Sequence, residues 1–303
     1  MEETVVRRKT VKWNKPAGAR RKANRRKRLV LYALMGVCIA AVAFFAVGFG
    51  IELYASRQSI TYYAKLTEEV ARRPPRMPAP EAPGQEAQPT DAPPGPPGAS
   101  VADSEPADEE EPWIPYVDFE ALGESFPGII GWLLLEGTPI DYPIMQTADN
   151  SYFLSHLPDG ARQRAGAIFL DYRNSPGFTD ANSLIYGHMS NSGEMFGALR
   201  NYRNQEFYDK NRELLIFTPE RDYGLVLIAG YLLDSGVEVP PLEFSGESDF
   251  EAYIDDIRGR SFFISDVGVG EGDRIVCLCT CAYDFRNARL IIVGKLVDLG
   301  GRS

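Results

Sequence analysis

Histidine and cysteine are both scarce in this chain of 303 residues. The two histidines are His156 and His188, and three of the four cysteines share the run Cys277-Leu278-Cys279-Thr280-Cys281. A strand would put these three thiols on one face without the usual CxxC turn, and few histidines remain to complete a zinc shell. The sequence therefore favours no metal site, and no cofactor is expected.

Charge is absent from Leu29 to Ile51, a run of 23 residues. At about 1.5 Å per residue, a helix of this length covers roughly 35 Å, which is enough to cross the hydrocarbon core of a bilayer. Residues 1–28 hold twelve Lys/Arg and two Asp/Glu, and such a basic flank stays in the cytoplasm. We expect a single-pass protein of the cell membrane whose C-terminal part is extracellular.

Two other interpretations of the N-terminus stay open. Leu53-Tyr54-Ala55 is an acceptable cleavage site for a signal peptide, although the apolar run is longer than the 7 to 15 residues typical of a signal core. The basic run alone would suggest nucleic-acid binding. Beside a membrane span it is more simply a topology signal that also favours anionic headgroups, so no nucleic-acid partner is expected.

A proline-rich segment follows the span. Residues 56–72 are compatible with a short helix at the membrane surface, and residues 73–112 hold most of the prolines and end in Asp108-Glu109-Glu110-Glu111. Such a composition buries too little apolar surface to fold and favours an extended spacer.

The expected organisation has four parts. They are a basic cytoplasmic tail (1–28), a transmembrane helix (29–54), a juxtamembrane segment and Pro/acidic linker (55–112), and one compact domain (113–303).

Short apolar stretches bounded by turn residues dominate the compact domain, and internal repeats are absent. They predict strands at 131–135, 140–146, 167–170, 183–186, 213–218, 223–233, 274–280 and 289–296. Helical patterns occur at 118–124, 195–200 and 249–258. Short strands at regular spacing favour a mainly β fold, either a closed barrel or a sandwich.

Cys281 and Arg289 flank the predicted loop 282–288, between two neighbouring strands. A thiol nucleophile needs a base to form the thiolate and a donor to hold the oxyanion that forms on attack. Arg289, with its permanent charge and fork of donors, can serve as that donor.

The base must be one of the two histidines. His188 follows a short apolar strand and Gly187, and strand-end loops of this kind carry functional side chains. His156 has no such setting and is expected to be an exposed loop residue. We therefore predict catalytic roles for His188, Cys281 and Arg289.

Residues 117–297 resemble the catalytic domain of class B sortases, the membrane-anchored cysteine transpeptidases of Gram-positive bacteria. The resemblance rests on the order and spacing of several motifs: Gly131-Trp132, Ile140-Asp141-Tyr142-Pro143, Asp149-Asn150 with Tyr152 and Leu154, GAIFLD at 166–171, Tyr186-Gly187-His188, Met195-Phe196 with Leu199, and Thr280-Cys281 with Arg289. The family usually has Thr-Leu-Ser-Thr-Cys up to the nucleophile, so Cys279 stands here in place of the serine.

The resemblance implies an eight-stranded sortase β-barrel with short peripheral helices, preceded by the transmembrane helix and the Pro-rich linker. It also implies that Cys281 cleaves a C-terminal sorting motif of secreted proteins after threonine, through a thioacyl-enzyme. The acyl group would then pass to an amine of peptidoglycan or of a pilin lysine. The expected partners are these substrates and the membrane, and the enzyme is expected to act as a monomer.

Four further residues are carried over from the family as substrate-binding: Asn150, Leu154, Cys279 and Thr280. Each has a structural alternative. Leu154 would be a core residue, Asn150 a helix cap, and Thr280 an ordinary strand residue. Cys279 would be a small apolar substitute for serine, or a redox partner that reversibly joins Cys281.

Three other functions are compatible with parts of the sequence. A papain-like hydrolase has its cysteine before its histidine, whereas His188 precedes Cys281 here. A cysteine peptidase that releases its product to water would use the same residues. A non-catalytic adhesion or scaffolding module on a stalk fits the composition, but it has no need of His188, Cys281 and Arg289 together.

Overall fold

The computed structural model describes residues 17–70, 117–190, 193–281 and 287–301. The predicted spacer at 73–112 lies outside the described residues. The chain divides into two compact units, Met1–Arg57 and Gln58–Ser303.

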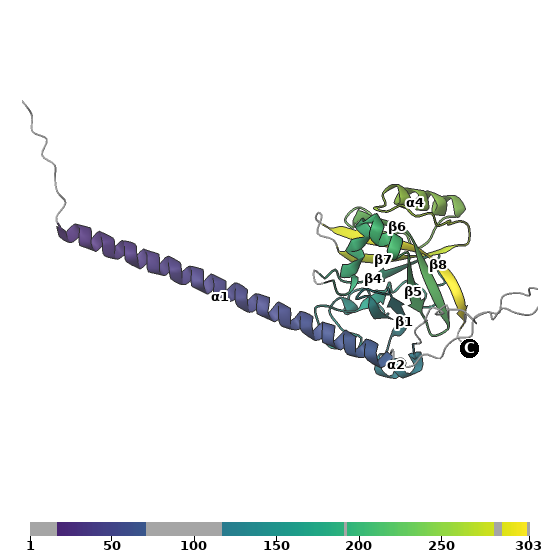
Figure 1. The fold of residues 1–303 in the computed structure, drawn as a ribbon, viewed down its shortest axis with the longest axis horizontal. Coiled ribbons are helices and arrows are strands. Elements are labelled where there is room, and N and C mark those ends of the chain that lie inside the picture. The colour runs from purple at the N-terminus through teal and green to yellow at the C-terminus, as the bar shows by residue number, and fades with distance from the viewer. Residues whose placement is uncertain (1–16, 71–116, 191–192, 282–286, 302–303) are drawn as a thin grey trace, which may run out of the picture. The chain divides into compact units, whose positions relative to one another are not determined.

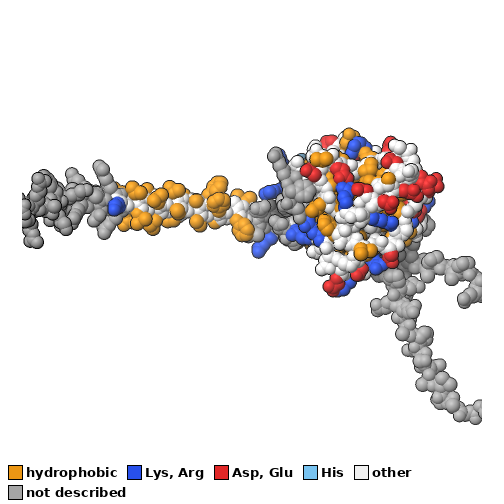
Figure 2. Space-filling model, turned by 90° about the horizontal axis from the view of Figure 1, so that it is seen from above, with side chains coloured by type: hydrophobic (Ala, Val, Ile, Leu, Met, Phe, Trp, Pro, Cys, Tyr) orange, Lys and Arg blue, Asp and Glu red, His pale blue; other side chains and the backbone are white. Residues whose placement is uncertain are grey.

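The first unit contains most of one long helix, α1 (Ala17–Val70). Its segment Leu29–Ile51 has a mean hydropathy of 2.6, and none of it is buried within the protein. The apolar side chains of this segment form a continuous exposed surface (Figure 2). By length and composition the segment can cross a membrane.

The second unit is built on a closed eight-stranded barrel (Figure 1). The strands are β1 (Ile129–Leu134), β2 (Asp141–Met145), β3 (Ile168–Leu170), β4 (Asn182–Tyr186), β5 (Glu213–Phe217), β6 (Arg221–Asp234), β7 (Arg274–Cys281) and β8 (Ala288–Gly301). Their order around the barrel is β1-β2-β3-β4-β7-β8-β6-β5. The β2–β3 and β4–β7 pairs are parallel, and the other pairs are antiparallel. The predicted closed eight-stranded barrel and all eight predicted strands are confirmed.

Short helices surround the barrel: α2 (Phe119–Ser125), η1 (Tyr152–Leu154), η2 (Phe196–Arg203), α3 (Gln205–Lys210) and α4 (Glu247–Gly259). The predicted helices at 118–124 and 249–258 are confirmed as α2 and α4. The one predicted at 195–200 is a 3₁₀ helix, η2, and the sequence pattern did not predict η1 or α3. In Figure 1, α2 and α4 lie at opposite sides of the barrel.

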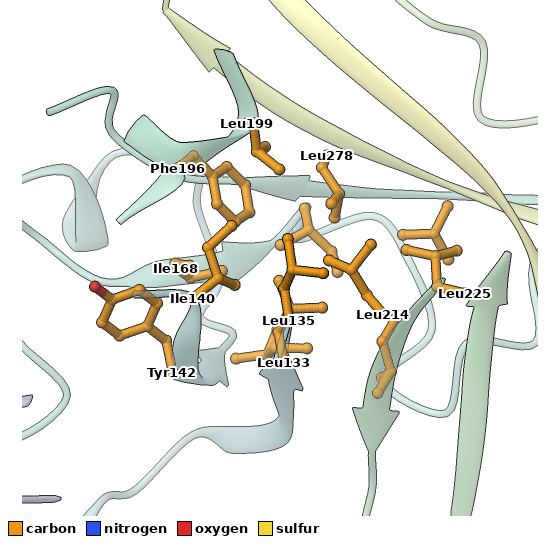
Figure 3. Close-up of a cluster of buried hydrophobic side chains, with 14 of the residues drawn as sticks. Leu133, Leu135, Ile140, Tyr142, Ile168, Phe196, Leu199, Leu214, Leu225 and Leu278 are labelled. Atoms are coloured by element: carbon orange, nitrogen blue, oxygen red, sulfur yellow. The ribbon is translucent and has the colours of Figure 1, made fainter. Parts of the chain in front are cut away.

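Leucine and isoleucine side chains fill the barrel (Figure 3). Leu133, Leu214, Leu225 and Leu278 come from four different strands and are each 0 to 1% exposed. Since side chains alternate between the two faces of a strand, every second residue of each strand contributes to this interior. Each such side chain contributes about 1.5–3 kcal/mol when fully buried.

A second apolar cluster covers part of the outer face of the barrel. It joins Cys277 and Cys279 of β7 to residues of α4, among them Ile254 and Ile257. Strand β7 is therefore buried on both faces, with Leu278 inside the barrel and the two thiols outside, in the cluster that includes α4.

The last turns of α1 belong to the barrel unit. Tyr63 and Leu66 are 5% and 4% exposed and join the main apolar cluster. The helix expected at 56–72 therefore exists as the C-terminal part of α1, but one of its faces packs on the protein. The compact unit begins at Gln58, well before residue 113.

Candidate active site

The register of β7 and β8 brings Cys281 and Arg289 together. They are direct backbone partners at the last antiparallel pair of the two strands. Residues 282–286, which connect the strands, lie outside the described residues, and so does the side chain of Cys281. The Arg289 side chain is half-buried, and its Nη1 donates to the carbonyl of Ala288 at 3.2 Å.

The register of β4 and β7 brings His188 to the same end of the sheet. Tyr186 pairs with Cys279, and the backbone N–H of Gly187 donates to the Cys279 carbonyl at 3.1 Å. Because the two strands are parallel, the chain continues in the same direction from Tyr186 to His188 and from Cys279 to Cys281. The three predicted catalytic positions therefore lie on three adjacent segments of backbone.

The imidazole of His188 is held by a backbone carbonyl. Its Nε2 lies 2.7 Å from the carbonyl oxygen of Leu154 at the end of η1. A carbonyl can only accept, so Nε2 carries a hydrogen, and Nδ1 is the nitrogen that can exchange a proton. The side chain of Leu154 is 45% exposed, so it is not a core residue.

Asn150 uses both ends of its amide within the protein. Its Nδ2 donates to Asp171 Oδ2 at 2.9 Å, and its Oδ1 accepts from the backbone N–H of Tyr172 at 3.0 Å. Asn150 therefore ties the segment before η1 to the end of β3. The carboxylate of Asp149, rather than Asn150, caps η1 by accepting the backbone N–H groups of Ser151 and Tyr152.

Asp171 is a buried carboxylate that the sequence reasoning did not single out, although it ends the GAIFLD motif. Arg173 donates two side-chain hydrogen bonds to it, at 2.9 and 2.8 Å, and the hydroxyl of Tyr186 donates at 3.1 Å. Burial raises the pKa of Asp171, but the hydrogen bonds from Arg173 and Asn150 outweigh it and leave the pKa at about 2. The carboxylate is therefore ionised at neutral pH.

Cys279 and Thr280 are both buried, at 4% and 2% exposed. Burial raises the pKa of the Cys279 thiol well above its ordinary value, and so do Cys277 and Asp171, while Arg289 lowers it. A thiol with a raised pKa stays protonated and reacts poorly. These features favour packing over redox chemistry for Cys279.

Thr280 lies on the opposite face of β7 from Cys279, because successive residues of a strand alternate. Its Oγ1 is buried and has no hydrogen-bond partner among the described residues. An unsatisfied buried hydroxyl costs about 1–3 kcal/mol.

The second histidine is part of a local aromatic pair. The ring of His156 stacks on Tyr152 with centroids 4.1 Å apart, and its Nδ1 lies 2.7 Å from the Tyr152 carbonyl oxygen. His156 is half-buried rather than freely exposed. In the described part of the chain, no group of three or more His, Cys, Asp or Glu residues is arranged to hold a metal ion.

Several known proteins are similar to this chain in sequence and in fold. The chain is 37% identical to sortase B of Listeria monocytogenes over 171 residues, which cover 56% of this chain and 70% of that protein. It is 30% identical to sortase B of Staphylococcus aureus over 183 residues, covering 60% and 75%. The structure of the S. aureus sortase B–substrate complex matches with a TM-score of 0.57 and 29% identity, covering 60% of this chain and 85% of that one. No protein-family model matches.

The closed mixed barrel is thus the sortase fold, and the protein is a cysteine transpeptidase. The extent of the two sequence matches shows that the chain belongs to the class B sortases. A cysteine-to-serine mutant of Clostridium perfringens sortase B has been solved with the same fold, at a TM-score of 0.56 and 29% identity.

Asp171→Asn is expected to lower the thermal unfolding midpoint at neutral pH, because the amide leaves the Arg173 guanidinium without its anion. An unfolded aspartate titrates near pH 3.9, so a folded pKa of about 2 stabilises the protein fully above about pH 4. This contribution is lost as the pH falls through about 2. The gap between variant and wild type should therefore shrink over that range in circular dichroism melts of the full chain in detergent.

The matched control is Asp118→Asn. Asp118 caps α2 by accepting the backbone N–H of Ala121, and asparagine caps helices about as well, so this variant should melt close to wild type. A gap for Asp171→Asn that stayed constant down to pH 2 would contradict the assignment.

Proposed function

We propose that this class B sortase cleaves a sorting motif of secreted proteins after a threonine and transfers the new carboxyl end to an amine, with His188, Cys281 and Arg289 as its catalytic residues. The observation that carries the proposal is the register of β7. One neighbouring strand pairs Arg289 with Cys281, and the other pairs Tyr186 with Cys279, which lie two residues before His188 and Cys281. Within the described part of the chain, no other pairing of a histidine with a cysteine has this support.

The reaction has two acyl transfers. The Cys281 thiolate attacks the threonine carbonyl, and the C–N bond breaks as a C–S bond forms. His188, protonated at Nδ1, gives its proton to the leaving amine. An incoming amine then loses a proton to His188 as it attacks the thioester; a new C–N bond forms, the C–S bond breaks, and the Cys281 thiolate and protonated His188 are restored.

Arg289 has two tasks in this scheme. Its guanidinium favours the thiolate of the neighbouring Cys281 over the neutral thiol, since an opposite charge nearby lowers a thiol's pKa. The same fork of donors offsets the oxyanion of each tetrahedral intermediate. Half-burial of Arg289 supports both tasks, because charges act more strongly where water is partly excluded.

The substrate groove, in this proposal, runs past Asn150 and Leu154. Leu154 offers an exposed apolar side chain, and Asn150 keeps one amide hydrogen for a substrate carbonyl beyond its bond to Asp171. Cys279 and Thr280 contribute through their backbone, since both side chains are buried.

The amine acceptor is proposed from related structures. S. aureus sortase B has been solved as a complex with substrate, and a sortase B has also been solved as a complex with triglycine. A glycine peptide supplies a primary amine like that of a peptidoglycan cross-bridge, and a pilin lysine supplies the same group. Triglycine is therefore the first acceptor to test.

The location of the enzyme follows from its N-terminus. The apolar segment Leu29–Ile51 anchors it in the cell membrane, the basic residues before it stay in the cytoplasm, and the barrel acts outside. Between the span and residues 113–303 lie the end of α1, which belongs to the barrel unit from Gln58 onward, and the proline-rich segment at 73–112, which is extended in this proposal.

Cys281→Ala is expected to abolish both cleavage and transfer while the barrel stays folded by circular dichroism. The assay uses the full chain in detergent with a pool of fluorescence-quenched peptides, each with threonine at the cleavage position, with and without triglycine. The thioacyl-enzyme is detected by mass spectrometry.

Cys279→Ser is the matched control and should stay active. A thioester found in Cys281→Ala would show that another cysteine is the nucleophile. Hydrolysis alone, even with triglycine, would indicate a peptidase.

His188→Ala is expected to lower kcat by about 10²–10⁴-fold, the usual cost of removing a general acid–base group. His156→Ala provides the control, because its ring stacks on Tyr152 and its Nδ1 lies against the Tyr152 carbonyl, and it should turn over near the wild-type rate. Equal losses in the two variants, measured with the same peptides, would be incompatible with the assignment.

Arg289→Lys should lower kcat by about 10²–10³-fold, the cost of losing an oxyanion donor, because a point charge does not replace the guanidinium fork. Arg274→Lys is the control at the other end of β7, where the arginine donates to the Phe178 carbonyl. Wild-type turnover by Arg289→Lys would reduce this arginine to a structural residue.

A further inference from the structure

The C-terminal turns of α1 place a tyrosine against both supports of His188. Tyr63 is 5% exposed and packs in the main apolar cluster with Leu66. Its side chain makes two specific contacts with the barrel unit, one through the hydroxyl and one through the ring. From each contact, a short series of hydrogen bonds and packing contacts, here called a path, leads to His188.

The first path runs through backbone to the imidazole. The Tyr63 hydroxyl donates to the Gly166 carbonyl at 2.8 Å, in a buried bond. Gly166 has φ +61°, and a Cβ there would lie 2.3 Å from the Phe153 carbonyl oxygen and 3.1 Å from that of Leu154. The two segments are thus in direct contact. The Leu154 carbonyl in turn holds Nε2 of His188.

The second path runs to the backbone of His188. The ring of Tyr63 meets that of Tyr142 edge to face, with centroids 4.8 Å apart. The Tyr142 hydroxyl, at the border of the core cluster in Figure 3, accepts the Met195 N–H at 3.1 Å. Met195 has φ +49°, a rarely adopted conformation for a side chain of this kind, and the next N–H, of Phe196, donates to the His188 carbonyl at 3.0 Å.

We propose that Tyr63 is a positioning residue for His188, which extends the site to the helix that carries the apolar span. The inference rests on the proposed acid–base role of His188. One path restrains the imidazole and the other restrains the backbone on which it is mounted. The Tyr63–Gly166 and Met195–Tyr142 hydrogen bonds are buried, and a buried group that loses its partner pays the cost of desolvation.

The test compares Tyr63→Phe with Tyr202→Phe in the full chain in detergent. Both variants lose a hydroxyl that donates to a backbone carbonyl, Gly166 for Tyr63 and Asn211 for Tyr202, at 2.8 and 2.9 Å. Both should therefore melt slightly below wild type. Tyr63→Phe alone should lower kcat by about tenfold with little change in KM, since displacement of a catalytic group by 1 Å costs up to about 100-fold.

Histidine-selective ¹⁵N NMR supplies a readout that needs no substrate, because the chain has only two histidines. The neutral His188 ring should be an Nε2–H tautomer in wild type and in Tyr202→Phe. In Tyr63→Phe it should become a mixture of tautomers, because Gly166, which lies against the Leu154 backbone, loses its hydrogen bond to Tyr63. His156→Asn assigns the two signals.

Two outcomes are decisive. If Tyr63→Phe and Tyr202→Phe have the same kcat and the same His188 spectrum, the inference is overturned. If His188→Ala keeps wild-type turnover, the proposed catalytic function fails, whatever the spectra of the tyrosine variants show. A tautomer change and a kcat loss confined to Tyr63→Phe, with His188→Ala inactive, support both.

Discussion

Strand β7 is the element on which the site depends, because its two neighbours pair with it in opposite directions. The antiparallel bond pattern with β8 ends at Cys281 and Arg289, and the parallel pattern with β4 leads to His188. A slip of one residue in either ladder would move every side chain of β7 to the other face. Burial on both faces prevents this, since Leu278 must lie inside the barrel and Cys277 and Cys279 outside it.

The surroundings of Cys279 disfavour its thiolate. Burial and the nearby Asp171 keep Cys279 neutral, because both disfavour a second negative charge. Asp171 itself is tolerated in the interior because Arg173, Tyr186 and Asn150 all donate to it. The same network holds the end of β3 to the loop before η1, so this carboxylate shapes the surroundings of the candidate site.

Sequence patterns predicted the strands well because each has a clear apolar run or alternation, as in β7 and β8. They failed where the signal is short or is not carried by side chains. Helix α3 has six residues, too few for a helical period to be visible. The carbonyl of Leu154 orients His188, but every residue has a backbone carbonyl, so the sequence does not indicate which one makes this contact. The sequence is compatible with a helix at the membrane surface over residues 56–72, and only the fold reveals that the face of this helix with Tyr63 is buried against the protein.

The parallel β4–β7 pair also determines when the site can first exist. His188 and Cys281 are 93 residues apart in sequence, and a contact between such distant segments forms only after the entropy of closing the intervening loop has been overcome. Polypeptides are made from the N-terminus, and Arg289 arrives with the last strand of the barrel. A chain that ends before β8 therefore carries the predicted histidine and thiol without Arg289, and its barrel cannot close between β7 and β6. The three predicted catalytic positions come together only when the last strand has been made.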